Sequence, residues 1–93
     1  MDSETLKTDK KIILLAHASQ GKKYRVVNIA GGHCLISRLN AMGIVIGDVI
    51  KVIYQTWGGP MTIAVKGVRI ALGRGIAHKI EVTEVKEDEQ QVE

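Results

Sequence analysis

The chain has 93 residues, which limits it to one domain, and a domain of this size buries about 60 to 65% of the surface of its unfolded chain. It contains no Phe, one Trp and two Tyr, so Val, Ile, Leu and Ala must fill the core, a bias that favours a sheet. A lone cysteine, Cys34, excludes an intramolecular disulfide framework and fits a reducing compartment. The start of the chain lacks the pattern of a signal peptide, and the apolar run at 12–16 is far shorter than the roughly 20 residues of a membrane helix. We therefore expect a cytoplasmic protein without direct membrane insertion.

Charge is unevenly distributed along the chain, although the net charge is only +3. Residues 21–80 hold nine lysines and arginines against one acid, Asp48, which gives a local charge of +8. From residue 81 onward six acids face one lysine, a local charge of −5. This pattern is compatible with an anionic partner for the body, and equally with a solvated surface whose tail offsets its own body.

Hydrophobic periodicity divides the chain into short elements. In chain order we expect a flexible arm at 1–11, strands at 12–15, 23–29, 49–54, 61–65, 68–72 and 79–85, a helix at 35–42 and an acidic tail at 86–93. Several short strands with one short helix, in about 75 residues, are typical of a small β-barrel. The fold class expected is therefore mainly β, with one barrel domain at 12–85.

Strict alternation along the two longest strands predicts which side chains share a face. In the first of them, Tyr24 and Val26 fall on one face and Ile29 on the other. In the second, Val52 and Tyr54 fall on one face.

The helix is predicted from apolar residues at period 3.6. Leu35, Leu39 and Met42 stand at positions i, i+4 and i+7, and we expect Leu39 to be a core residue. Arg38 falls on the opposite side of the helix turn. Gly43 follows the last periodic residue and is expected to end the helix in the left-handed conformation.

Glycines mark the predicted turns. Lys66-Gly67 is a two-residue hairpin connection, and Gly58-Gly59-Pro60 is expected to join two other strands. Gly73-Arg74-Gly75 resembles part of a phosphate-binding fingerprint, but position 78 holds His instead of the third glycine and no long helix follows. We therefore interpret it as a barrel corner, at which the glycines let the backbone leave one strand and re-enter the next.

Residues that could carry chemistry are few. His33 and Cys34 are adjacent, so their side chains diverge and cannot chelate as a pair, while His17 and His78 would have to be brought close by the fold. We expect no metal site and no cofactor, and expect Cys34 to be a small hydrophobe near the helix start. Because Asp48 is the one carboxylate of the body, paired catalytic carboxylates are absent and no enzyme is expected.

A set of short segments stands in the order and spacing of one known family: Arg38-Leu39, Met42-Gly43-Ile44, Gly47, Gly59-Pro60, Gly67, Ala71-Leu72, Ala77 and Ile80-Glu81-Val82. Through these segments, over about residues 12–83, the chain resembles the FeoA family of small ferrous iron transport accessory proteins. The family often has an arginine directly after the leucine at position 72, whereas this chain has Gly73 there and Arg74 one residue later.

The resemblance implies an SH3-like β-barrel that works in the cytoplasm with FeoB, the membrane ferrous iron transporter that bears a G-protein domain. The same fold occurs as the C-terminal domain of diphtheria-toxin-repressor-type metalloregulators. We accordingly expect a stand-alone, non-enzymatic accessory or regulatory protein of ferrous iron uptake.

Two binding hypotheses follow. In the first, the chain docks on the cytoplasmic part of the transporter. The residues expected to bind this partner are Leu35, Arg38, Met42, Trp57, Pro60 and Arg74. In the second, the basic body binds nucleic acid, although single-strand binders stack bases on aromatic side chains and this chain has few. Salt dependence separates the two, because phosphate binding weakens steeply between about 50 and 200 mM salt.

Overall fold

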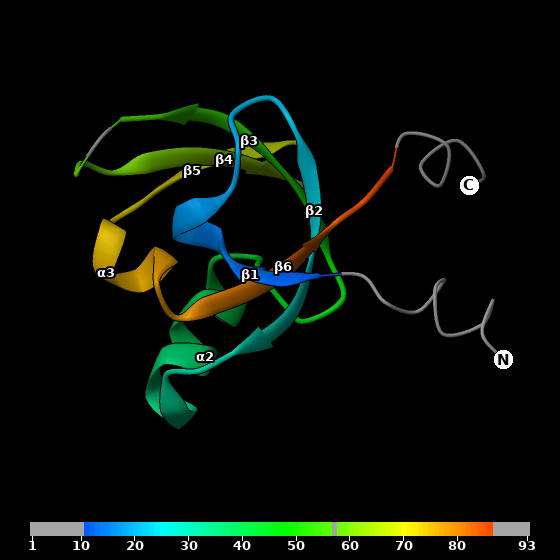
Figure 1. The fold of residues 1–93 in the computed structure, drawn as a ribbon. Coiled ribbons are helices and arrows are strands. Elements are labelled where there is room, and N and C mark those ends of the chain that lie inside the picture. Colours follow the sequence, from blue (N-terminus) through cyan, green and yellow to red (C-terminus); the bar gives the residue numbers. More distant parts are fainter. Residues whose placement is uncertain (1–10, 57, 87–93) are drawn as a thin grey trace, which may run out of the picture.

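A computed structural model describes residues 11–56 and 58–86 of the chain (Figure 1). Its elements are β1 (Ile12–Leu14), the 3-10 helix η1 (Leu15–His17), β2 (Lys23–Ile29), α2 (Gly32–Ala41), β3 (Val49–Gln55), β4 (Met61–Val65), β5 (Val68–Leu72), α3 (Arg74–Ala77) and β6 (Ile80–Glu84). The predicted mainly β fold is confirmed. The bounds of β2, β4 and β5 are those expected from the sequence.

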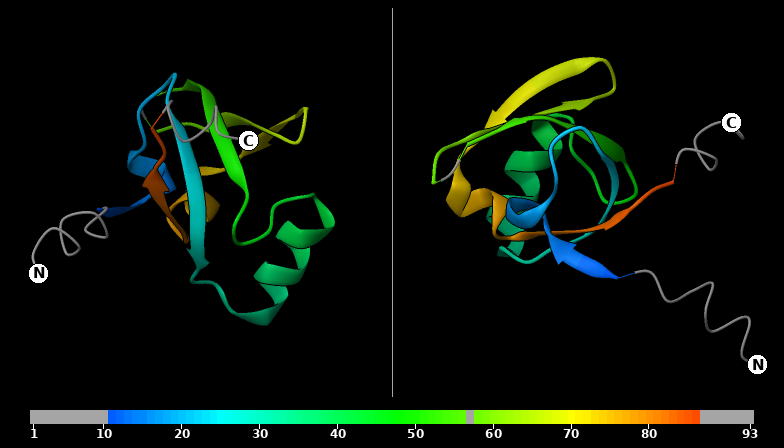
Figure 2. Two further views of the ribbon diagram at one scale, coloured as in Figure 1. Left: turned by 90° about the vertical axis from the view of Figure 1, so that its right-hand side faces the viewer. Right: turned by 45° about the horizontal axis from the view of Figure 1, so that its top comes forward.

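The strands form one antiparallel sheet in the order β1-β6-β2-β3-β4-β5. Among the described residues β1 and β5 do not pair, so the sheet curves like a small barrel without closing. Figure 1 shows η1 and α3 between the two ends of this curved sheet, and the two short helices contact each other. Figures 1 and 2 place α2 at the end of the sheet where β2 finishes.

The core consists almost entirely of aliphatic side chains inside the curved sheet. Its fully buried members include Leu15, Val26, Leu39, Ile44, Ile50, Val52, Ile63, Leu72, Ile80 and Val82. Burying each such side chain contributes about 1.5 to 3 kcal/mol, which offsets the lack of large aromatic residues. The expected core position of Leu39 is confirmed.

Two β-bulges correct the strict alternation expected for the longest strands. The register between β2 and β6 shifts between Val26 and Asn28, so Ile29 is buried on the same side as Val26. The register between β3 and β4 shifts between Val52 and Tyr54, and Tyr54 is 54% exposed although Val52 is buried. An extra residue on one strand reverses the facing of everything beyond it, which explains both errors.

Helix α2 ends in a Schellman motif. Gly43 has φ of 97°, and its N–H donates to the carbonyl of Asn40, while the N–H of Ile44 donates to the carbonyl of Leu39. Leu39 and Ile44 are both fully buried, which supplies the apolar contact of this motif. The predicted role of Gly43 is confirmed, and the motif directs the chain from the helix into the loop before β3.

The predicted two-residue hairpin between β4 and β5 is confirmed, with positive φ at both Lys66 and Gly67, as a type I′ turn requires. The corner at residues 73–75 is also present, but the reason given for its glycines is wrong. Gly73 has φ of −69° and precedes helix α3, and Gly75 also lacks a positive φ. Neither glycine is needed there for its conformational freedom.

Candidate functional site

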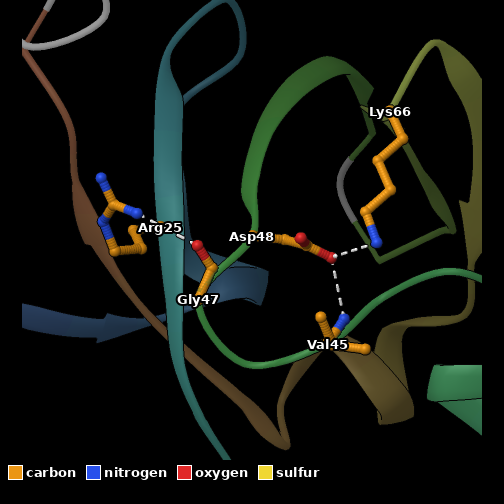
Figure 3. Close-up of polar contacts among 5 residues, drawn as sticks. All are labelled: Arg25, Val45, Gly47, Asp48 and Lys66. Atoms are coloured by element: carbon orange, nitrogen blue, oxygen red, sulfur yellow. Dashed lines mark hydrogen bonds and ion pairs between the residues drawn. The ribbon is translucent and has the colours of Figure 1, made fainter. Parts of the chain in front are cut away.

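The loop between α2 and β3 is held by Asp48 (Figure 3). The backbone N–H of Val45 donates to Asp48 Oδ2 at 2.9 Å, and Lys66 Nζ lies 3.3 Å from the same oxygen. The N–H of Asp48 donates in return to the carbonyl of Val45 at 3.1 Å. The one acid in the basic body is therefore a structural clamp on this loop.

The same loop is also bonded to strand β2. Gly47 N–H donates to the carbonyl of Val26 at 2.8 Å, and Val26 N–H donates to the carbonyl of Asp48 at 2.9 Å. Arg25 Nη1 donates to the carbonyl of Gly47 at 3.0 Å. These bonds hold the backbone of the loop in one conformation.

Two apolar side chains are exposed where this loop follows the helix. Met42 is 41% exposed and Ile46 is 53% exposed, and Arg38 one turn before Met42 is exposed as well. We call these three residues the helix–loop surface. Leu35, predicted to bind a partner, is half-buried and packs against the core, so its contribution to this surface is indirect.

A second region lies around Arg74. A pocket of about 530 Å³ is lined by Ala16, His17, Ala18, Ser19, Gln20, Gln55, Thr56 and Arg74. Pro60, which is exposed, borders this region because the Thr56 hydroxyl donates to its carbonyl at 3.5 Å. We call this the Arg74 pocket. Trp57, also predicted to bind a partner, lies outside the described residues.

The predicted partner-binding residues therefore divide into two groups. Arg38 and Met42 belong to the helix–loop surface, and Arg74 and Pro60 to the region of the Arg74 pocket. In Figure 1 α3, which carries Arg74, lies at the left of the molecule, and α2 lies at the bottom. The two groups belong to different elements, and their shared role stays a prediction.

The fold brings His17 and His78 close to each other, which the sequence alone did not predict. The rings of His17 and His78 meet edge to face, with centroids 5.5 Å apart. His33 and Cys34 lie on α2, far from that pair in the sequence. Within residues 11–56 and 58–86, no group of three or more His, Cys, Asp or Glu side chains is arranged to hold a metal ion.

Cys34 lies in the first turn of α2, as expected, but its side chain is exposed and does not pack as a small hydrophobe in the core. It precedes Leu39 by five residues, which places it about 140° around the helix from that buried leucine. The side chain therefore faces away from the core stripe of α2.

Part of the basic body is neutralised by local ion pairs. Lys22 Nζ lies 3.5 Å from Glu84, and Lys66 pairs with Asp48 as described. Tyr24 is buried and its hydroxyl accepts the N–H of Ser19 at 2.8 Å, which leaves Tyr54 as the one exposed tyrosine among the described residues. That is a poor stacking platform for a single strand.

Two residues of these regions were not predicted from the sequence. Ile46 sits in an apolar run, Ile44 to Ile46, that is too short to show which side chain is buried. Gln55 ends a strand, and its place in the pocket depends on a bond from its Nε2 to the carbonyl of Ala18 at 3.0 Å. Neither the exposure of Ile46 nor the position of the Gln55 side chain can be predicted from the neighbouring sequence.

The curved six-stranded antiparallel sheet with its short helices defines a small β-barrel-like domain of the SH3-like class. No helix within the described ranges is long and apolar enough to cross a membrane. A family model described as "FeoA domain" matches residues 13–84, and the chain belongs to the FeoA family.

Relatives of known description agree with this assignment. A candidate Fe(2+) transport protein A from Methanocaldococcus jannaschii is 43% identical over 72 residues, which cover 77% of this chain and 87% of that protein. The crystal structure of an iron uptake regulatory protein (FeoA) superimposes with a TM-score of 0.76 and 37% identity, and covers 81% of this chain and 100% of that one. A manganese-dependent transcriptional repressor shares the fold, with a TM-score of 0.74 and 18% identity over 82% of this chain and 43% of the repressor.

Proposed function

We propose that this chain is a non-enzymatic, cytoplasmic accessory protein of ferrous iron uptake that docks on the cytoplasmic part of a FeoB-type ferrous iron transporter. The family and the descriptions of the relatives support the link to iron transport. The observation that carries the docking step is the helix–loop surface, where apolar side chains are exposed at the end of α2 and on a loop whose backbone is held by hydrogen bonds.

Rigidity matters because ordering a mobile loop on binding lowers affinity. The Asp48 clamp and the bonds to β2 have already ordered the loop that carries Ile46. Met42 and Arg38 beside it are residue types enriched at protein interfaces. The complementary surface on the transporter is an apolar patch with an acidic rim that meets Arg38.

The mechanism requires no chemistry in this chain. A protein that binds one conformation of the transporter more tightly than another shifts the population by the difference in binding free energy. Tight binding that is equal for both conformations would have no effect on transport.

The test is calorimetric titration of this chain into the purified cytoplasmic domain of the FeoB-type transporter from the same genome. Ile46→Glu places a charge in the centre of the helix–loop surface and is expected to weaken binding by about tenfold or more. Ile12→Glu is the matched control, because Ile12 on β1 is 57% exposed, about as much as Ile46, and lies outside the surface. Arg38→Glu is expected to weaken binding and to reduce its dependence on salt.

Equal losses in the Ile46 and Ile12 variants, or no binding by the unaltered chain, contradict the proposal. Binding of RNA or DNA that disappears between about 50 and 200 mM salt, without binding of the transporter domain, would favour the nucleic-acid alternative instead.

A further inference from the structure

Several polar groups that line the Arg74 pocket have identified hydrogen-bond partners. Within it Gln55 N–H donates to Gln20 Oε1 at 3.1 Å, and Gln55 Nε2 donates to the carbonyl of Ala18 at 3.0 Å. Ser19 N–H donates to Tyr24 Oη at 2.8 Å. These bonds fix the orientation of the Gln55 amide, because its nitrogen is committed to Ala18.

Two polar atoms of the side chains that line the pocket have no hydrogen-bond partner among the described residues. Gln55 Oε1 and Arg74 Nη1 are both shielded from solvent and have no hydrogen-bond partner within residues 11–56 and 58–86. A buried acceptor and a buried donor without partners are unfavourable, and native proteins retain few of them. Both belong to side chains that line the same pocket, so one occupant could satisfy both.

The charged side chains of the pocket indicate that its ligand is an anion. Its described lining includes the guanidinium of Arg74 and the imidazole of His17, but no carboxylate. A cation would find no charged ligand there, whereas a carboxylate matches the planar, rigid fork of a guanidinium. The volume of about 530 Å³ lies within the range of roughly 300 to 1,000 Å³ typical of small-ligand pockets.

The free acceptor of Gln55 adds a second requirement. A carboxylate alone satisfies Arg74 but offers no donor to Gln55 Oε1. We propose that the Arg74 pocket binds a carboxylate that carries an O–H or N–H donor beside it in the same ligand. A hydroxycarboxylic acid has this chemistry, and so does the C-terminus of a peptide, with its last amide N–H. As part of this proposal, the guanidinium rotates on binding and brings Arg74 Nη1, which is shielded in the structure, to the carboxylate, while the donor of the ligand reaches Gln55 Oε1 with the amide nitrogen still bonded to Ala18.

This binding site is independent of the proposed docking on the transporter. It uses none of the three residues of the helix–loop surface, and a ligand in it could be tested on the isolated chain. Failure of one proposal therefore leaves the other standing.

Two matched pairs of probes test the donor requirement by amide chemical-shift titration of the full chain. Citrate and tricarballylate have the same three carboxyl groups, but only citrate has the hydroxyl. N-acetylglycine and N-acetylsarcosine differ by one methyl group that removes the amide N–H. We expect the donor-bearing member of at least one pair to bind about fivefold or more tightly than its partner, the effect of one hydrogen bond. The shifts should centre on residues 16–20, 55, 56 and 74.

The two pairs also separate the sources of the ligand. A preference confined to citrate indicates a free hydroxycarboxylate, and one confined to N-acetylglycine indicates a peptide terminus. Either result supports the shared chemistry. Equal binding within both pairs, or shifts centred on other basic residues such as Lys51, overturns the proposal, because simple attraction of anions would then explain the data. If the highest probe concentration used causes no shifts, the proposal is also overturned, because water alone would then satisfy the polar groups of the pocket.

Variants test separately the interaction of the carboxylate with Arg74 and that of the donor with Gln55. Arg74→Met is expected to abolish binding, whereas Arg69→Met, at an exposed arginine on β5, should leave the affinity unchanged. Gln55→Met should retain the carboxylate interaction but lose the preference for the donor-bearing probe. If Arg74→Met perturbs the whole amide spectrum, Arg74→Lys serves in its place, because it keeps the charge and loses the fork. Equal affinity in the Arg74 and Arg69 variants contradicts the assignment.

Discussion

Asp48 and Arg74 are both charged side chains with limited exposure, yet their surroundings differ. Asp48, whose side chain is 15% exposed, accepts a backbone N–H and pairs with Lys66. Arg74 is half-buried and retains a nitrogen without a partner among the described residues. The bonding of Asp48 is fully explained by the fold, whereas that of Arg74 is not. The comparison teaches that partner count, more than charge or burial, separates a structural group from one available for a ligand.

The helix–loop surface depends on the core beneath it, so the largest effect is expected there. Leu39→Ala should lower the free energy of unfolding by about 2 to 4 kcal/mol, because Leu39 is fully buried at the end of α2 and its truncation leaves a cavity. Urea denaturation measures this loss. Met42→Ala on the same helix end is the control, with an expected change within about 0.5 kcal/mol. Similar losses in both variants would show that Met42 is part of the core and not of a binding surface.

Removing the Asp48 clamp is expected to have the next largest effect. Asp48→Ala leaves the partly buried N–H of Val45 without its partner and should cost about 1 to 3 kcal/mol of stability. Asp48→Asn keeps an acceptor for that N–H and loses the pair with Lys66, whose amine is largely exposed, so its cost should stay below about 1 kcal/mol. Amide exchange at Val45 should accelerate in the Ala variant alone. Equal costs in the two variants would assign the clamp to charge instead of hydrogen bonding.

The elements that could be predicted from the sequence are those set by local patterns. The period-two alternation located β4 and β5, and Gly43 located the end of α2, because a residue with positive φ must follow the helix there. The exposure of Arg38 follows in the same way from its position on the helix. Each of these features depends on residues within one or two turns of the chain.

The features that escaped prediction depend on partners distant in the sequence. The bulges that place Ile29 in the core and Tyr54 on the surface are set by the register with β6 and β4. The approach of His17 to His78 brings together residues 61 positions apart, and the Arg74 pocket joins η1, the end of β3 and α3. No pattern within one segment contains this information, so the pocket could not be found from the sequence.

Glycines provide a finer test of local conformation in the two regions. Gly43→Ala should lower stability by about 1 kcal/mol, because an L-residue resists the φ of 97° found there. Gly73→Ala, beside the Arg74 pocket, should be neutral or stabilise by about 0.4 to 1 kcal/mol, because its φ is −69° and no atom lies within 4 Å of an added Cβ. Thermal unfolding of the two variants decides the matter, and a loss at Gly73 as large as that at Gly43 would restore the conformational role first assigned to the corner.

The smallest effect on stability is expected at Arg74, where the comparison with Asp48 is most direct. Arg74→Met should change the free energy of unfolding by no more than about 0.5 kcal/mol, because the variant keeps the apolar stem and leaves no buried group newly unpaired. The bond between His78 Nδ1 and the backbone carbonyl of Arg74 is unaffected by the change. Urea denaturation beside Arg69→Met provides the measurement and its control. A loss as large as that of Asp48→Ala would mean that the fold already uses the Arg74 guanidinium, and the difference between the two regions would disappear.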